Sequence, residues 1–494
     1  MILIIQSQPL KLAKVVGWFA IMASAVSQEY GAGINAVATT SLGPYPGVGN
    51  LVPLAMLITG LLLIPKVFMF QRFGGVVPSS GGEYGWMSRT IHPRIGFYIH
   101  FLYFAGVIAA IGFLAYTTGS TLASTLVDLG ITGGAWFATF SGHLLFGLIL
   151  IWAIFGIHFS GVRSYGVLVI VLFAVVLTAA LISMAVGFGT SQTALSSALT
   201  SKIFHGPIPT TKVPPLTYES FFGTMTLFIF AYGGLSAAPL LGGEAKNPKR
   251  DMPIGIIAAW IVAIVLFSLV AFAVFHALSA SNAIALIKSK HSYYATVPGI
   301  LSLVAPPVIG DILSIVVTII LAKTIAPEMM AASRTLYAWS RDSTIPKIFG
   351  HTNRFKAPDF SLFIVALVGT VFLVDTSFVG VSVVAIRSLS VLFVIFFLGV
   401  GVLLTARKKE KKEWEKKVTT ISMIIAAIVG IIVAIVMVPS VIVVPHTSLV
   451  LQPSFQILLS LIIAVIIYEA SRLYMKAKTG LNLSEEISSA LPQE

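Results

Sequence analysis

The chain has 494 residues, of which 57% are hydrophobic and only 10% charged, and its mean hydropathy is +0.97. These values exclude a soluble globular domain of ordinary size and indicate a membrane protein. The absence of cysteine excludes a disulfide framework, thiolate metal sites and cysteine catalysis. The net charge of +13 is spread between hydrophobic segments rather than gathered in one basic domain, which argues against nucleic acid as a partner.

About twelve hydrophobic segments are long enough to be predicted as membrane-spanning helices, so the predicted fold class is an all-α membrane protein. A re-entrant or interfacial segment containing Ser79, Ser80, Gly81 and Gly82 follows the second of them. In chain order the predicted spans cover about residues 15–42, 51–70, 95–126, 135–157, 165–188, a sixth beginning at 218, 254–278, 308–339, 360–374, 386–406, 421–438 and 457–474.

The distribution of Lys and Arg predicts the orientation. With both termini in the cytoplasm, 24 of the 31 basic residues fall in inside segments and four in outside loops. This bias fits the positive-inside rule and indicates a multi-pass protein of the plasma membrane. Residues 1–14 and 477–494 are then the cytoplasmic termini, 189–217 an extracellular loop, and 407–418 a basic cytoplasmic linker near anionic lipid.

Two predicted spans are interrupted by glycines, at Gly31-Ala32-Gly33 and at Tyr232-Gly233-Gly234. Glycine inside a helix costs about 1 kcal/mol relative to alanine, and irregular backbone at membrane depth is tolerated only inside protein or beside a cavity. Two interpretations remain open: the breaks present backbone groups to a substrate, or the glycines allow close helix packing.

The spans also show a coarse internal repeat. The first and sixth are broken, and the third and eighth are unusually long, so residues 15–188 and 218–406 form two units of five helices each. Because five is odd, the second unit is inverted in the membrane. Residues 419–476 supply two additional helices. Glycine-interrupted helices at matching positions of two inverted units are typical of the binding site of a transporter.

Four motifs in this order resemble those of the amino acid–polyamine–organocation permeases, over about residues 15–406. They are Gly31-Ala32-Gly33-Ile34; Pro78 to Tyr84 with Trp86 and Arg89; Phe230-Ala231-Tyr232-x-Gly234 followed by Glu244, Asn247, Pro248, Arg250 and Pro253; and Arg334 with Ala338 to Asp342, Ile345 and Pro346. The resemblance implies a LeuT-like 5+5 inverted repeat and alternating-access transport of an amino acid or related amine.

In such a site, backbone N–H groups at Gly31, Ala32, Gly33 and Ile34 would receive the substrate carboxylate. Carbonyl groups around Phe230 and Ala231 would accept hydrogen bonds from the α-ammonium. Tyr232 would cover the substrate as a lid, or else be a packing tyrosine with a satisfied hydroxyl. Gly234 and Ser236 complete the predicted substrate-binding set. The resemblance further suggests a cytoplasmic gate made by Glu244, Arg250, Arg341 and Asp342.

The departures from the family pattern bear on substrate and coupling. Ser236 stands where many members carry an acid, which favours a neutral substrate side chain, and the helix-five lysine of some proton-coupled members falls at about Val176. Our hypothesis is that two charges inside predicted spans, Glu29 and Lys323, approach each other and serve ion coupling. The alternatives are a structural ion pair or a lysine whose ammonium extends to water.

The sequence thus predicts a proton-coupled or exchanging permease for a neutral amino acid, and not an enzyme, because no nucleophile–base pair or metal cluster is evident. A transporter of a polyamine or other organic amine, or a transporter-like sensor, stays open. No cofactor or metal is expected, and the coupling ion is H+ or Na+. The expected partners are the amino acid substrate and the lipid bilayer, while the oligomeric state is left open.

Overall fold

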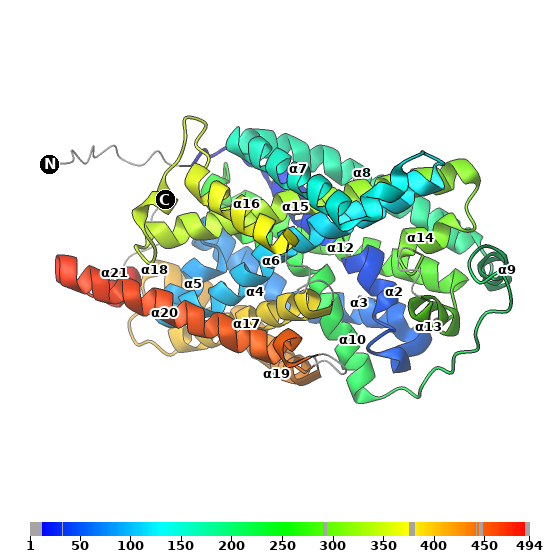
Figure 1. Cartoon of the computed structure of the whole chain (residues 1–494). Helices are drawn as coiled ribbons and strands as arrows, with labels where there is room; N and C mark the ends of the chain where they lie inside the picture. The colour runs from blue at the N-terminus through cyan, green and yellow to red at the C-terminus, as the bar shows by residue number, and fades with distance from the viewer. Residues whose placement is uncertain are drawn as a thin grey trace.

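The structure is a computed structural model, and it describes residues 12–31, 33–289, 294–374, 381–440, 442–443 and 448–489. Across these ranges the protein is an all-helical bundle without a named β-strand, and its one isolated bridge joins Val16 to Ala245 (Figure 1). The first half comprises α1 (Trp18–Glu29), η1 (Gly33–Val37), α2 (Ala38–Thr40), η2 (Pro46–Leu51), α3 (Val52–Leu62), α4 (Ile64–Val76), α5 (Glu83–Thr90), α6 (Pro93–Asp128), η3 (Gly134–Ala138), α7 (Phe140–Phe159), α8 (Val162–Gly189) and α9 (Gln192–Lys202).

The second half begins with another helix that is interrupted after four turns. Its elements are α10 (Tyr218–Ala231), η4 (Gly233–Ser236), α11 (Ala237–Leu240), η5 (Gly242–Glu244), α12 (Pro248–Ala277), α13 (Ala280–Lys288), α14 (Val297–Ser302), α15 (Pro307–Arg341), η6 (Lys347–Gly350), α16 (Asp359–Val374), α17 (Val381–Ala406), α18 (Glu413–Val418), α19 (Ile421–Met437), η8 (Val438–Ser440), η9 (Leu449–Leu451), α20 (Pro453–Thr479) and α21 (Leu483–Ser489).

Within the described ranges, nine helices are long and apolar enough to cross a membrane. A tenth span is formed if α10 and the η4–α11 segment are counted together, although they are bent by 48° at the break. The helix α16 is apolar but has only 16 residues, and the first predicted span is divided between the 12-residue α1 and the short η1 and α2. The protein is therefore a multi-pass membrane protein.

Local sequence explains where the interrupted elements begin and end. The helix α10 starts at a capping box, in which Thr217 accepts from the Ser220 backbone and the Ser220 hydroxyl accepts from Thr217 N–H. The short helix α5 starts after Gly82, whose φ of +47° is a left-handed conformation that favours glycine. This turn places α5 between α4 and α6, where the sequence predicts a re-entrant or interfacial segment.

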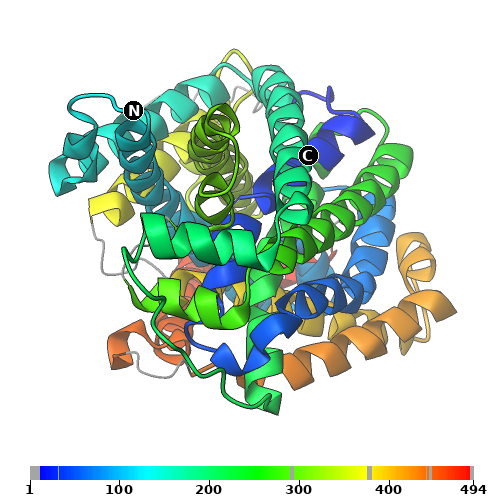
Figure 2. The ribbon, with the colours of Figure 1, turned by 90° about the vertical axis from the view of Figure 1, so that its right-hand side faces the viewer.

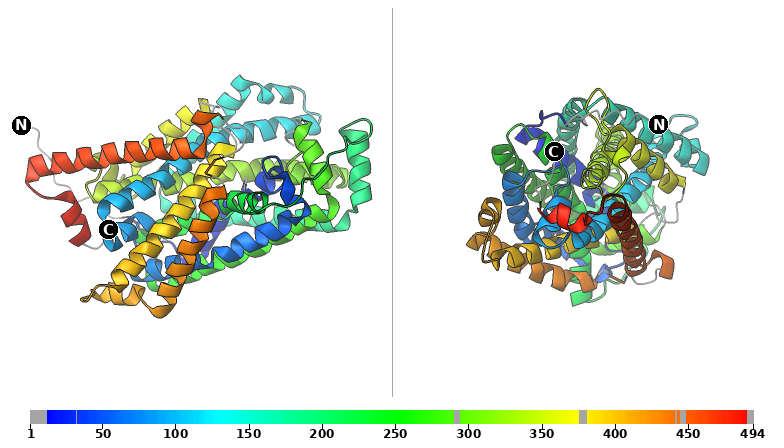
Figure 3. Two further views of the ribbon diagram at one scale, coloured as in Figure 1. Left: turned by 90° about the horizontal axis from the view of Figure 1, so that it is seen from below. Right: turned by 90° about the vertical axis from the view of Figure 1, so that its left-hand side faces the viewer.

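The interrupted helices occupy the middle of the bundle and the long helices surround them. The helix α1 packs against η4, α10 packs against η1, and the two longest helices, α6 and α15, pack along each other. The helices α19 and α20 lie along the outside (Figure 3). Viewed from one end, short helices such as α9 and α13 lie across the ends of the long ones (Figure 2).

The two ends of the bundle carry different segments. Helices α5, α18 and α21 lie at one end, which we call the basic end because it includes the linker 407–418, whereas α9, α13 and α14 lie at the opposite end (Figure 1). This separation places the segments predicted to be cytoplasmic apart from the loops predicted to be extracellular.

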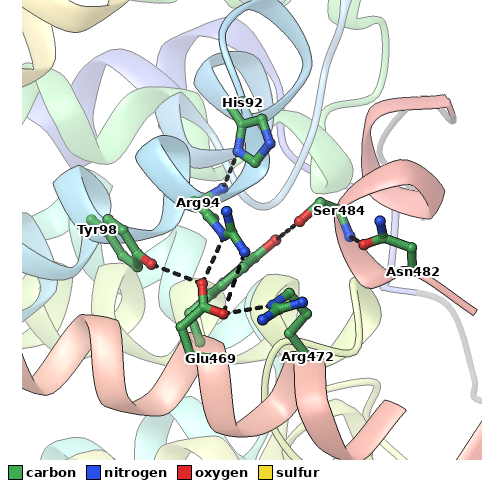
Figure 4. A network of polar contacts seen from close by, with 8 residues as sticks. His92, Arg94, Tyr98, Glu469, Arg472, Asn482 and Ser484 are labelled. Atoms are coloured by element: carbon green, nitrogen blue, oxygen red, sulfur yellow. Dashed lines mark hydrogen bonds and ion pairs between the residues drawn. The ribbon is translucent and has the colours of Figure 1, made fainter. Parts of the chain in front are cut away.

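At the basic end, polar contacts join α20 to the start of α6 (Figure 4). Glu469 is the centre of this network: it pairs with Arg94 at 2.7 Å and with Arg472 at 2.5 Å, and it accepts a hydrogen bond from Tyr98. Tyr468 and Ser484 link α20 to α21 in the same region. Both arginines are partly exposed, so these ion pairs contribute little to the free energy of folding. Their role is to hold α20 in place against α6.

Candidate functional site

The two helix breaks lie directly against each other. A Cβ atom at Gly33 would come within 2.4 Å of the Ala231 Cα atom, and one at Gly234 would come within 2.5 Å of the Ala25 carbonyl oxygen. Gly31 is similarly close to Thr324 of α15. Close packing of glycines, which the sequence left as an alternative to a binding role, is therefore present, and it brings the two irregular segments together.

A small cavity is enclosed where the breaks meet, with room for about one water molecule. Seven elements contribute to it, namely α1, η1, α6, α10, η4, α15 and α17. Its lining residues are Gln28, Glu29, Gly33, Leu114, Phe230, Gly234, Thr324, Glu328 and Arg387. An amino acid needs more room, so these elements have to separate for a ligand to enter.

Of the predicted substrate-binding residues, Gly33, Phe230 and Gly234 line this cavity. Five others are buried in the surrounding shell without lining it: Gly31, Ile34, Ala231, Tyr232 and Ser236. Ala32 lies outside the described residues.

Tyr232 has the contacts of a packing residue in this closed conformation. Its hydroxyl donates to the Met56 carbonyl at 3.2 Å, and its ring lies 5.1 Å from that of Phe267. The side chain therefore points toward α3 and α12 rather than into the cavity, which corresponds to the second of the two roles considered from the sequence.

Glu29 and Lys323 do not form the direct contact that we hypothesised, as far as the described residues show. Glu29 accepts a hydrogen bond from the Leu235 N–H at 3.1 Å, and so it bridges the two breaks. Lys323 donates instead to the Ser27 carbonyl of α1. Both side chains are buried and both bind next to the first break, but each has its own partner.

The sequence reasoning missed three further charged residues in the same region. Lys66 of α4 is fully buried and interacts electrostatically with the carboxylates of Glu83 and Glu29. Glu83, at the start of α5, has the Ser236 hydroxyl and His100 as polar neighbours. The third is Arg387 of α17, which pairs with Glu328 at 3.1 Å. Charge within an apolar segment was the available signal, and it applied to Lys66 and Arg387 as much as to Lys323.

Many polar atoms of this buried cluster lack a hydrogen-bond partner among the described residues. They include both amide atoms of Gln28, one oxygen of Glu29, the Lys66 ammonium and the Nη1 atom of Arg387. An unsatisfied buried polar group costs about 1–3 kcal/mol, so such atoms usually have a functional explanation. Those of Gln28, Glu29 and Arg387 belong to side chains that line the cavity at the helix breaks.

Two of the four residues predicted to form a gate have ion-pair partners outside that set. Glu244 pairs with Arg334 at 2.9 Å, and Asp342 accepts two hydrogen bonds from Arg89, at 2.6 and 2.9 Å. Arg250 is exposed at the start of α12. Arg341 and Asp342 line a second small pocket together with Ser79, Tyr84, Arg89 and Ala338. These two pairs join α5 and η5 to the C-terminal part of α15.

No group of three or more His, Asp or Glu side chains in the described ranges could hold a metal ion. The side chains that line the cavity include one guanidinium and two carboxylates.

Comparison with known proteins relates the chain to a family of transporters. A family model described as amino acid permease matches residues 16–467. The branched-chain amino acid permease BcaP of Lactococcus lactis is 23% identical over 399 residues, which cover 77% of this chain and 81% of that protein. The methylthioribose transporter of Bacillus subtilis is 23% identical over 370 residues, or 72% and 73% of the two chains. Cationic amino acid transporter 5 of Arabidopsis thaliana is 22% identical over 275 residues, or 53% and 44%.

Proposed function

The chain belongs to the amino acid permease family, and from this membership we propose that it is a secondary active transporter that moves a neutral amino acid across the plasma membrane by alternating access. The observation that carries the proposal is the contact between the two broken helices around a closed cavity. Backbone groups released at a break supply binding atoms at membrane depth without buried charge. A small enclosed cavity of this kind is expected for an intermediate of an alternating-access cycle.

In the proposed bound state, the substrate carboxylate lies at the break formed by Gly31, Ala32, Gly33 and Ile34. The α-ammonium lies near the carbonyl groups of Phe230 and Ala231. Glu29 supports this orientation of the substrate, because its carboxylate lines the cavity beside the second break, where the ammonium is proposed to lie. Ser236 adds no charge there, which favours a neutral substrate over the basic ones.

The proposed fold is the LeuT-like 5+5 inverted repeat, with twelve spans and the unit boundaries predicted from the sequence. Three pairs of features support it. The breaks fall in the first helix of each unit, the longest helices α6 and α15 take the same place in each, and short helices precede both of them: α5 before α6, and α13 and α14 before α15. The positions of the linker 407–418 and of α21 at the basic end support cytoplasmic termini.

We propose that transport is coupled to protons through Lys323 and Glu29, with exchange as the other mode. Lys323 donates to a carbonyl of α1 just before the break, where a cation would otherwise be held, and Glu29 bridges to η4. A change in the charge of either group would alter contacts on both broken helices. Proton coupling through this pair does not require the two side chains to touch.

The experiment is uptake of radiolabelled neutral amino acids into proteoliposomes, with and without an imposed pH gradient. We expect saturable uptake that a pH gradient accelerates, and loss of that acceleration in Lys323→Met, while uptake by exchange continues. The variant Lys202→Met, at the opposite end of the bundle, is the control. Absence of uptake and exchange for all amino acids would contradict the proposed function, and unchanged pH dependence in Lys323→Met would contradict only the coupling.

A further inference from the structure

The cavity contains a charged pair whose hydrogen bonds are incomplete. Arg387 is 1% exposed, and a single nitrogen of its guanidinium, Nη2, contacts both Glu328 oxygens, at 3.2 and 3.1 Å. Its carbon Cζ lies 4.6 Å from the centre of the Tyr103 ring, whose hydroxyl is close by without a hydrogen bond of normal geometry. The second terminal nitrogen, Nη1, has no hydrogen-bond partner among the described residues.

Gln28 of α1 is the third polar group of this part of the cavity. It is 5% exposed, lines the cavity and lies beside Glu328. Neither its amide oxygen nor its amide nitrogen makes a hydrogen bond of normal geometry within the described ranges. Together the three side chains present donors from Arg387 and Gln28 and acceptors from Glu328 and Gln28.

We propose that Gln28, Glu328 and Arg387 form a subsite for the side chain of the substrate, and that this side chain carries a carboxamide, as in glutamine and asparagine. The inference rests on the transport function proposed above. A carboxamide has one acceptor oxygen and two N–H donors, so it can accept from Arg387 Nη1 and donate to Glu328 at once. The charges of Arg387 and Glu328 cancel, so a neutral side chain fits them.

Other side chains fit this subsite less well. An acidic side chain would meet the Glu328 carboxylate as well as the Arg387 guanidinium, and a basic one would meet the guanidinium as well as the carboxylate, so neither gains a net opposite charge from the pair. A branched aliphatic side chain would leave Arg387 Nη1 and the Gln28 amide without a hydrogen-bond partner in a buried site, and sites built for hydrogen bonding reject such analogues strongly. Leu114 and Phe230 offer contact to the methylene groups of glutamine or asparagine.

The test is binding of amino acids to the detergent-purified protein, measured by displacement of tritiated glutamine. We expect glutamine or asparagine to bind at least about tenfold more tightly than leucine, glutamate or arginine, the factor that corresponds to one good hydrogen bond. Leucine that binds as tightly as glutamine and asparagine would overturn the inference.

A variant separates the subsite from the rest of the cavity. Gln28→Leu has similar volume and leaves no buried charge unpaired, and we expect it to lower the affinity for glutamine about tenfold while leucine binds unchanged or better. The matched control is Gln71→Leu on α4, outside this cavity, which should change neither affinity.

The failures of the two proposals are distinguishable. If Gln28→Leu lowers the affinities for glutamine and leucine equally, or changes neither affinity, the subsite inference is wrong although the proposed transport function stands. If no amino acid binds or is taken up by the unaltered protein, the proposed function itself is wrong. Should Gln28→Leu fail to fold, the comparison of ligands on the unaltered protein still decides the inference.

Discussion

Two buried arginine–carboxylate pairs, one at the basic end and one in the central cavity, differ in how many guanidinium nitrogens contact the carboxylate. Arg89 meets Asp342 with both terminal nitrogens, one on each carboxylate oxygen, at 2.6 and 2.9 Å. Arg387 meets Glu328 with one nitrogen only. A two-bond contact fixes the geometry of both partners, whereas a one-nitrogen contact leaves donors for something else. We infer that the first pair holds the end closed and the second pair serves binding.

The surroundings of the pairs differ in the same way. The pair at the basic end joins α5 to Asp342, the residue that follows α15, and the two are far apart along the chain. The central pair faces a cavity that Gln28 and Glu29 also line, each with unbonded polar atoms. Saturated contacts are expected where a conformation has to be stable, and unsaturated ones where a ligand is to supply the missing bonds.

The largest expected effect comes from breaking the central pair. Arg387→Met leaves the Glu328 charge buried without its partner, and removal of one member of a buried pair typically costs about 3–5 kcal/mol. We expect a large fall in the thermal unfolding temperature of the purified protein. The double variant Arg387→Met/Glu328→Gln should recover most of that loss, because no charge then remains unpaired.

This double variant also sharpens the comparison of the pairs. If the central pair serves binding, the recovered protein stays unable to take up amino acids although it is stable. Recovery of both stability and uptake would mean that the pair has only a structural role.

A smaller effect is expected from separating the two breaks. In Gly33→Ala the new methyl group would lie 2.4 Å from the Ala231 Cα atom, so backbone has to move, and overpacking of this kind costs about 1–3 kcal/mol. We expect loss of uptake and a moderate fall in thermal stability. Gly156→Ala in α7 is the control, because a methyl group there meets no atom within 4 Å. Equal uptake by the two variants would show that close contact of the breaks is dispensable.

Much of the fold could be predicted because long hydrophobic segments, and glycines that interrupt them, can be recognised in the amino-acid sequence. The glycines at Gly31, Gly33 and Gly234 can be read from the sequence, and at each of them a Cβ atom would lie within 3 Å of a neighbouring atom. Charge within an apolar run is equally readable, so Lys66 and Arg387 could have been included with Glu29 and Lys323.

The choice of partners could not be predicted in this way. Arg334 and Arg341 are seven residues apart and so lie on nearly the same face of α15, and either could have met Glu244. Which arginine pairs with Glu244 depends on where η5 lies along α15, and tertiary packing sets that position. The direction of the Tyr232 side chain was undetermined for the same reason, because it depends on the position of Met56 and Phe267.

The smallest expected effect comes from removing the ion pair of Arg89 and Asp342 at the basic end. Without Arg89 the basic end loses a charge-assisted two-bond contact, and we expect Arg89→Met to populate a conformation that is open there about tenfold more often. The chain has no native cysteine, so Ala338→Cys introduces a single thiol beside this pair. The measurement is the rate at which a water-soluble maleimide labels that thiol.

Labelling of Ala338→Cys should be faster with Arg89→Met than without it, and glutamine should slow it again if binding favours the closed state. Arg94→Met is the matched control, because it lies at the same end and Glu469 keeps Arg472 as a partner. If Arg94→Met accelerates labelling as much as Arg89→Met, the effect is a general loosening of this end. If neither does, closure depends on the pair of Glu244 and Arg334, which connects η5 to α15 and is almost fully buried.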